Sequence, residues 1–299
     1  MRTAFIAALR EAAGHREDVF LIVADLGFSV VEQFAQEFPG RFLNAGVAEQ
    51  NATGVAAGLA SEGYHVFTYS IANFPTLRCL EQIRNDVCYH GLPVTVVAVG
   101  AGMSYGSLGY SHHAVQDLAV MRSLPGMTVL SPADPGETRE CVEWLVANPC
   151  PSYLRLGKAG EPRLHDVRGI TAGPLEIIRG DGAQALVATG SVLKVALEAV
   201  PLAVAAGLSP SVFSCPWLQP VSGEFFLGLS RFRRIVALEE HVAAGGLASL
   251  LREHLPATIE VVSQAVSHAL AGQVGSQSHL RREAKLTPDR LVEHLRAPF

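Results

Sequence analysis

The sequence predicts an α/β protein with two domains, each built on a doubly wound and mostly parallel sheet. Two observations carry this prediction. Continuous apolar runs, typical of strands covered on both faces, alternate with segments of helical periodicity. The alternation stops near residue 157, in a stretch rich in Gly, Pro, Arg and Asp, and starts again near residue 183. We therefore expect a first domain over residues 1–160, a linker over 161–182 and a second domain over 183–299.

The first domain alternates strands with helices in the manner of crossover units. Its first apolar run is Val-Phe-Leu-Ile-Val at residues 19–23, which reads as a fully buried strand. Further strands are expected at residues 64–69, 92–99, 128–130 and 152–156. Helices are expected at residues 3–13, 49–60, 74–90, 115–122 and 135–147. This order favours parallel strands, because a helix returns the chain to the same edge of the sheet.

The second domain repeats the same rhythm with fewer clear elements. Strands are expected at residues 184–191, 234–238 and 258–262. An acidic pair and His241 follow the middle strand, in the segment Leu-Glu-Glu-His-Val. Their spacing does not match a metal site, so we interpret them as residues that stabilise the end of the strand.

Composition narrows the function classes. The chain has 299 residues, 49% of them hydrophobic and only 17% charged, with a net charge of −5. No basic patch for nucleic acid and no apolar run of membrane-spanning length is present, and the N-terminus does not resemble a signal peptide. The five cysteines show no C-x-x-C spacing, which suits a reducing compartment. We expect a cytoplasmic protein whose surface is partly covered by another subunit.

Two acidic residues lie where ligands bind in such folds. Asp25 follows the first strand, at the carboxyl end of the sheet. A role as a turn or capping residue is the alternative. Glu49 stands at the start of a helix that is composed almost entirely of Ala, Gly and Val, so a second backbone can approach this helix closely. A carboxylate in that setting needs a partner, although a first-turn Glu can also simply complement the helix dipole.

Residues 44–60 resemble the glutamate motif of thiamine-diphosphate enzymes of the transketolase family. The similarity extends through most of the chain and covers the C-terminal half of a full-length transketolase. It implies that residues 1–160 form a pyrimidine-binding domain and residues 183–299 a transketolase C-terminal domain. It also implies that Glu49 hydrogen-bonds a ring nitrogen of the cofactor's aminopyrimidine, which favours the imino tautomer that deprotonates the thiazolium ring. The family has an acidic residue near the cofactor at the position of Asp25.

Two further segments resemble family motifs that line the cofactor and substrate. Residues 68–85 resemble "STFxxF…EQIRN", which places Phe74 on the phenylalanine that stacks on the pyrimidine and Ile71 on the first phenylalanine. Residues 106–113 resemble "EDGPTHQ", which places His112 on the active-site histidine and His113 on the following glutamine. The resemblance implies that His112 hydrogen-bonds the substrate oxygen and moves protons. Two successive side chains point in different directions, so at most one of these imidazoles is expected to face the reaction.

The sequence departs from the family where transketolases bind sugar phosphate. Leu108 replaces an aspartate that reads a donor hydroxyl, and Gly100 replaces a phosphate-binding histidine. Lys158 aligns with the phosphate-binding arginine, so it keeps the charge but loses the bidentate fork. We therefore expect an altered grip on the substrate phosphate.

The motif that binds the diphosphate is missing. The family uses Gly-Asp-Gly followed some 25–30 residues later by Asn, in a separate domain. The Gly-Asp-Gly at residues 180–182 lies in the expected linker, and residues 183–299 contain no Asn. Because Mg²⁺ needs oxygen ligands besides the phosphates, we expect a partner subunit to bind the Mg²⁺ and the diphosphate. The resemblance thus implies one subunit of a split transketolase, assembled as an α2β2 heterotetramer and active only with its partner.

Three functions remain open at this point. The favoured one is transfer of a two-carbon ketol unit from a ketose to an aldehyde, in a specialised biosynthetic pathway. The β subunit of a 2-oxoacid dehydrogenase shares the glutamate and the histidine, and would pass an acyl group to a carrier thiol. A non-catalytic partner subunit is the alternative of another class.

Overall fold

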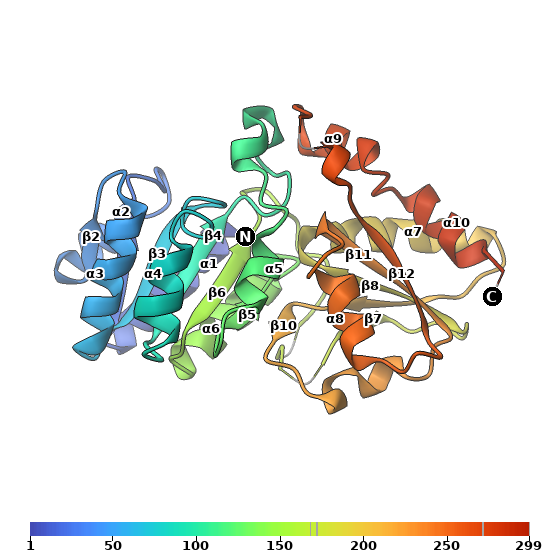
Figure 1. The fold of residues 1–299 in the computed structure, drawn as a ribbon, viewed down its shortest axis with the longest axis horizontal. Coiled ribbons are helices and arrows are strands. Elements are labelled where there is room, and N and C mark those ends of the chain that lie inside the picture. The colour runs from blue at the N-terminus through green and yellow to red at the C-terminus, as the bar shows by residue number, and fades with distance from the viewer. Residues whose placement is uncertain (168, 172, 271, 299) are drawn as a thin grey trace.

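A computed structural model provides the structure of the chain and describes residues 1–167, 169–171, 173–270 and 272–298 (Figure 1). Two sheets lie side by side, and helices cover the faces of each. The expected α/β class with two mostly parallel sheets is confirmed. No helix in the described ranges is long and apolar enough to cross a membrane.

The first sheet has seven strands in the order β10-β5-β6-β4-β3-β1-β2. Its strands are β1 (Val19–Val23), β2 (Phe42–Asn44), β3 (His65–Ile71), β4 (Val94–Val99), β5 (Thr128–Leu130), β6 (Ser152–Leu156) and β10 (Trp217–Gln219). The neighbours from β5 to β2 pair in parallel, whereas β10 pairs antiparallel with β5. The carboxyl ends of β1, β3 and β4 therefore share one edge, where ligands bind in open parallel sheets.

Helices on both faces of this sheet follow the apolar pattern of the sequence. They are α1 (Arg2–His15), α2 (Glu32–Glu37), α3 (Glu49–Ser61), α4 (Leu80–Gln82), α5 (Asp117–Arg122) and α6 (Pro135–Ala147), with the short turns η1 (Pro39–Arg41), η3 (Gly106–Leu108) and η4 (Tyr110–His112) and the π-helical η2 (Ile83–Cys88). Helix α6 starts where the sequence favours it: the Asp134 side chain accepts from the Glu137 amide, and Pro135 occupies the first turn.

The helix expected over residues 74–90 starts later than predicted. Residues 74–79 form turns, α4 begins at Leu80, and the helix continues as the π-helical turn η2. The early part is instead held by local contacts, because the Phe74 amide donates to the Ile71 carbonyl and the Cys79 thiol donates to the Phe74 carbonyl. This turn directs Phe74 toward the carboxyl ends of the strands, where the candidate site lies.

Helix α3 packs closely on the sheet because its inner face is made of alanines. Ala52, Ala56 and Ala60 are buried against a small cluster that includes Ile22 and Val66. Small side chains let the helix axis approach the strands, and this places its first residue directly beside the ends of β1 and β3.

The second sheet has five strands in the order β12-β11-β8-β9-β7. Its strands are β7 (Leu175–Ile178), β8 (Gln184–Thr189), β9 (Ser211–Ser214), β11 (Arg234–Val242) and β12 (Glu260–Val266). Its helices and turns are η5 (Gly190–Val192), α7 (Leu193–Ala205), η6 (Gly223–Leu229), α8 (Leu247–His254), η7 (His268–Leu270), α9 (Gln277–Glu283) and α10 (Pro288–Arg296). All pairs are parallel except β7 with β9.

Residues 161–182, which we expected to be a linker, contain the strand β7. This strand lies at the sheet edge, and most of its residues are only half-buried. An edge strand needs no continuous apolar run, so the pattern that reveals central strands does not detect it. The domain boundaries proposed from the sequence remain a prediction.

Candidate active site

Glu49 opens α3 and is buried at the carboxyl edge of the first sheet. Its side chain is only 5% exposed, and its Oε2 lies 2.7 Å from Nη1 of Arg78. A cavity of about 10 Å³ lies next to it, lined partly by Thr68 and Ser70 at the end of β3. The carboxylate thus has the charged partner that its burial demands.

Phe74 and His112 lie on the other side of Arg78. The Arg78 guanidinium carbon is 4.6 Å from the centroid of the Phe74 ring, within cation–π distance. The Phe74 and His112 rings meet edge to face, with their centroids 5.2 Å apart and their planes at 76°. Three residues predicted from the sequence are therefore joined into one cluster by Arg78, which no sequence pattern singles out.

The two adjacent histidines point to different places. His112 is half-buried against Phe74, and its Nδ1 lies 3.0 Å from the Ser111 hydroxyl. Burial and the neighbouring charge of His113 both lower the pKa of His112, so the imidazole is neutral at pH 7. A neutral imidazole can accept a proton from a substrate hydroxyl.

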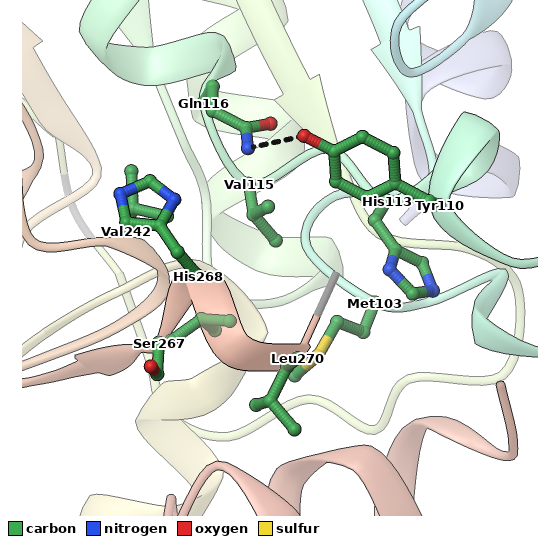
Figure 2. Close-up of a pocket in the computed structure, with 10 residues that line it drawn as sticks. Met103, Tyr110, His113, Val115, Gln116, Val242, Ser267, His268 and Leu270 are labelled. Atoms are coloured by element: carbon green, nitrogen blue, oxygen red, sulfur yellow. Dashed lines mark hydrogen bonds between the residues drawn. The ribbon is translucent and has the colours of Figure 1, made fainter. Parts of the chain in front are cut away.

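His113 instead lines a pocket together with Ser267 and His268 of the segment that follows β12 (Figure 2). Its ring is 3% exposed and borders a cavity of about 10 Å³ that Met103, Tyr110 and His268 also line. Its Nε2 is buried without a hydrogen-bond partner among the described residues. The expectation that only one imidazole faces the cluster of Glu49 and Phe74 agrees with this arrangement, and a substrate-binding role for His113 stays a prediction.

Asn73 fixes His112 over Phe74. Its Nδ2 donates to the carbonyls of Ser111 and His113, at 3.1 and 2.9 Å. Because Asn73 directly precedes Phe74, these two bonds tie the histidine loop to the turn that carries the aromatic ring. The relative position of Phe74 and His112 is thus set by backbone contacts.

A buried ion pair holds the far end of the same loop. Arg155 on β6 donates to Asp117 from Nε at 2.7 Å, and Asp117 also accepts from the Tyr153 hydroxyl at 2.6 Å. Arg155 further donates to the carbonyls of Ala114, 2.6 Å away, and Glu240, 3.1 Å away. One guanidinium therefore joins the histidine loop, α5 and β11. Despite the desolvation of the carboxylate, the Arg155 charge lowers the pKa of Asp117.

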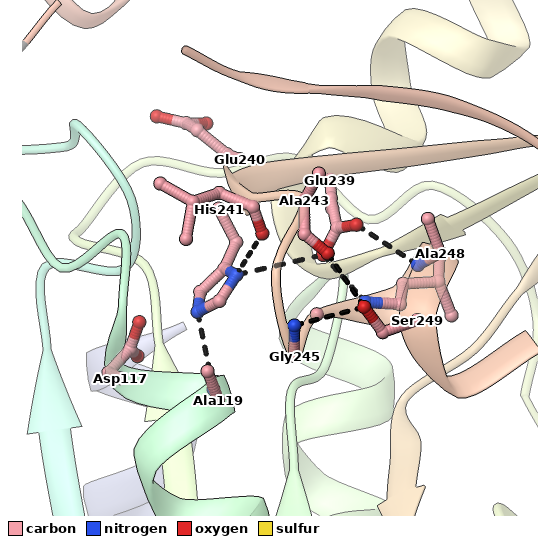
Figure 3. A network of polar contacts seen from close by, with 12 residues as sticks. Asp117, Ala119, Glu239, Glu240, His241, Ala243, Gly245, Ala248 and Ser249 are labelled. Carbon is pink, nitrogen blue, oxygen red and sulfur yellow. Dashed lines mark hydrogen bonds and ion pairs between the residues drawn. The ribbon is translucent and has the colours of Figure 1, made fainter. Parts of the chain in front are cut away.

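Glu239 and His241 at the end of β11 belong to a network of polar contacts that includes the start of α8 and the Ala119 amide of α5 (Figure 3). Glu239 accepts from the amides of Leu247 and Ala248 at the start of α8, and burial raises its pKa to about 7. Burial lowers the pKa of His241 to about 4. This neutral ring accepts from the Ala119 amide at Nε2, so its Nδ1 carries the proton that it donates to the Val242 carbonyl.

The bonds of Glu239 and His241 go to backbone groups at the end of β11 and the start of α8, which agrees with the expectation that they stabilise the strand end. Within the described ranges, no group of three or more His, Cys, Asp or Glu is placed to hold a metal ion. The Gly-Asp-Gly of residues 180–182 forms a turn before β8, where the amides of Gly180 and Asp181 donate to Ser211 and Ser209. These glycines therefore serve a local turn that is bonded to Ser209 and Ser211.

Asp25 and Ile71 lie at the carboxyl ends of β1 and β3. Asp25 is exposed just after β1 with a φ of 52°, and its amide donates to the Asn44 side chain at 3.0 Å. The Asn44 amide group returns a bond of 3.3 Å to the Asp25 carboxylate. Ile71 is half-buried at the end of β3, one turn before Phe74. Roles of these two residues in cofactor binding stay predictions.

Tyr105 leaves no room for a side chain at position 100. Gly100 has a φ of 101°, and a Cβ placed on it would lie 2.4 Å from the Tyr105 ring. A histidine therefore does not fit at this position while Tyr105 keeps its place. Leu108 is 56% exposed, and Lys158 is exposed after β6. Of the two positions that align with phosphate-binding residues of the family, 100 and 158, the second therefore keeps a positive charge, as Lys158.

The arrangement fits a planar, hydrogen-bonding aromatic group. It offers a buried carboxylate, the face of Phe74 and a neutral imidazole in one row, and a planar guanidinium already fills the space between the first two. An aminopyrimidine has the same shape and the same bonding needs. The described residues of this site provide no matching set for a diphosphate.

Comparison with known proteins agrees with this interpretation. Residues 1–160 match the family described as "Transketolase, pyrimidine binding domain", and residues 173–291 match "Transketolase, C-terminal domain". The chain is 33% identical over 258 residues to an apulose-4-phosphate transketolase subunit of Phocaeicola vulgatus, and the match covers 85% of this chain and 83% of that protein. It is 31% identical over 296 residues to a 6-deoxy-6-sulfo-D-fructose transketolase subunit of a Clostridium species, with 98% and 92% covered.

A solved structure shares both domains. A split-gene transketolase, described as an inactive β4 tetramer, superposes with a TM-score of 0.85 at 35% sequence identity. The match covers 98% of this chain and 95% of the other.

Proposed function

The chain belongs to the transketolase family, and from this premise we propose that it is the pyrimidine-binding subunit of a split, thiamine-diphosphate-dependent transketolase. The reaction is transfer of a two-carbon ketol unit from a ketose donor to an aldehyde acceptor. The observation that carries the proposal is the row formed by Glu49, Phe74 and His112, because each has a separate role in that chemistry.

Glu49 serves to polarise the cofactor's pyrimidine ring. A carboxylate that is 5% exposed forms strong hydrogen bonds, because little water competes for it. Phe74 provides the apolar face on which the pyrimidine stacks. Thiamine diphosphate, when bound, supplies the nucleophilic thiazolium carbon that carries the two-carbon unit.

His112 serves the substrate. Its imidazole lies beside Phe74 and is neutral at pH 7, so it can accept a proton from a substrate hydroxyl and return it to an oxygen. Asn73 and Ser111 hold the ring and its loop in place, which keeps the proton acceptor oriented before the substrate arrives.

A partner subunit completes the site. We propose that it binds the diphosphate and Mg²⁺ in an α2β2 heterotetramer, because this chain lacks the Gly-Asp-Gly…Asn pattern of the family. Two findings support this. The relatives are named as subunits, and the β-only assembly of the split-gene transketolase is described as inactive.

We propose a specialised substrate, in which the end remote from the reacting carbonyl differs from that of ordinary pentose phosphates. The apolar side chain of Leu108 cannot hydrogen-bond a donor hydroxyl. Tyr105 leaves no room for a phosphate-binding histidine at position 100. Lys158 supplies a compact ammonium in place of the bidentate guanidinium of an arginine. The relatives are named for apulose 4-phosphate and 6-deoxy-6-sulfo-D-fructose, so anionic groups of different kinds occur among their substrates.

Co-expression with a candidate diphosphate-binding subunit tests the proposal. The purified complex is assayed for ketol transfer with and without thiamine diphosphate and Mg²⁺, against each subunit alone. We expect turnover only from the complex with cofactor present. Turnover by this chain alone contradicts the split arrangement, and a complex that binds the cofactor but is inert toward a panel of ketoses and aldehydes favours a non-catalytic subunit.

A further inference from the structure

Arg78 makes the two contacts that the proposed function assigns to the aminopyrimidine ring of the cofactor. Its Nη1 donates to Glu49 Oε2 at 2.7 Å, and its guanidinium carbon lies 4.6 Å from the centroid of the Phe74 ring. The carboxylate and the aromatic face are thus both engaged by a single side chain of the same polypeptide.

The guanidinium and the aminopyrimidine are chemically similar at this position. A guanidinium is planar and delocalised, donates hydrogen bonds within its plane and stacks through its flat face. An aminopyrimidine likewise hydrogen-bonds a carboxylate within the plane of its ring and stacks on a phenyl ring through its flat face. One face of Phe74 holds one such group at a time, so the two compete for it.

We infer that Arg78 is a placeholder, a side chain that occupies the pyrimidine position and has to leave before the cofactor can bind. This inference rests on the proposed function. In the placeholder state Glu49 keeps a charged partner, which avoids the cost of burying an unpaired carboxylate. The cofactor then binds only the fraction of molecules in which the guanidinium has swung out, and its apparent affinity is reduced by that fraction.

The backbone around Arg78 allows this movement to be confined to the side chain. The Arg78 amide donates to the Asn73 carbonyl at 3.3 Å, and its own carbonyl accepts from Gln50 Nε2 at 3.1 Å. Both bonds are independent of the guanidinium. The side chain is also 46% exposed, so it can rotate toward solvent while the turn that carries Phe74 stays in place.

The test measures the dissociation constant of thiamine diphosphate, by calorimetry in Mg²⁺ buffer, for the complex with the diphosphate-binding subunit. Arg78→Ala removes the competitor and is expected to tighten binding by about tenfold. Arg290→Ala is the control, because this arginine lies on α10 of the second domain, outside the segments that resemble cofactor-lining motifs, and its side chain pairs with Glu293. It is expected to leave the dissociation constant unchanged.

A second pair of variants separates competition from other effects. In a Glu49→Gln background the neutral amide holds the guanidinium less firmly, so adding Arg78→Ala is expected to change the dissociation constant by less than about threefold. If Arg78→Ala alone leaves the affinity for thiamine diphosphate unchanged or weakens it, the inference is overturned. Arg78 would then either help to bind the cofactor or lie away from the pyrimidine position. Complete failure of the unsubstituted complex to bind thiamine diphosphate overturns the proposed function itself, and the inference falls with it.

Discussion

The rings of Phe74 and His112 meet edge to face with their centroids 5.2 Å apart, although 37 residues of intervening chain separate them. Asn73 produces this contact by binding the backbone on both sides of His112. The residue proposed to stack on the cofactor and the residue proposed to carry the proton are therefore held together as one unit, and substitutions at either position test the same proposed site.

His112→Ala is expected to lower kcat of the assembled complex by about 10²–10⁴-fold, the usual contribution of a positioned general acid or base. His90→Ala is the control, since His90 is an exposed histidine whose ring packs only on Tyr89 among the described aromatic contacts. Both rates come from a ketol-transfer assay at saturating substrate. If His112→Ala and His90→Ala have the same kcat, His112 has no part in the mechanism.

We expect kcat/KM to fall on the acid side only at a pH below the ordinary pKa of histidine. In the proposed mechanism the neutral imidazole of His112 accepts the proton. Burial and the charge of His113 lower the pKa of His112, so the neutral form persists as the pH falls. His113→Gln removes that neighbouring charge. The pKa of His112 then rises, and the acid limb of kcat/KM moves to higher pH. A shift toward lower pH, or none, contradicts the electrostatic link between the two residues.

Lys158→Ala is expected to raise KM for an anionic substrate by about tenfold and to leave KM for an uncharged analogue unchanged. The reason is that Tyr105 occupies the place next to Gly100, so Lys158 carries the charge that remains of the aligned phosphate-binding residues. Initial rates with matched phosphorylated and unphosphorylated aldehydes measure this. Equal changes for both acceptors would show that Lys158 does not read the anion.

Asp117→Ala is expected to destabilise the fold by about 3–5 kcal/mol, because it leaves the Arg155 guanidinium, itself 2% exposed, without its carboxylate. Glu253→Ala serves as the control. It breaks an ion pair of the same 2.7 Å length, between Arg122 and a half-exposed carboxylate, and is expected to cost at most about 1 kcal/mol. Urea unfolding of both variants gives the comparison, and similar losses would contradict a structural role for the buried pair.

Much of the fold could be predicted because its central strands are continuous apolar runs. Residues 19–23 and 152–156 are strands with the predicted bounds, and the helix expected at 135–147 also begins and ends as predicted. The short strands β7 and β10 could not be predicted. One is a half-buried edge strand, and the other has three residues that join the sheet of the preceding domain.

The site was only partly visible in the sequence. Glu49, Phe74 and His112 lie in segments that resemble known motifs, so their types and positions were readable. Arg78 lies in an ordinary helical-looking stretch, where an arginine predicts only a solvated face. Its contact with Glu49 spans 29 positions and exists because the turn after β3 folds back over the start of α3. Such a pair is a property of the tertiary structure.

The most direct measurement compares ketol transfer by the assembled complex carrying Glu49→Gln with that of Glu62→Gln, a control at the exposed C-terminal end of the same helix. With folding checked by circular dichroism and assembly by gel filtration, Glu49→Gln is expected to lose turnover by about 10³-fold, and Glu62→Gln to keep it. A Glu49→Gln complex that turns over within about threefold of the unsubstituted enzyme would contradict the account, since no proton relay through this carboxylate would then be needed.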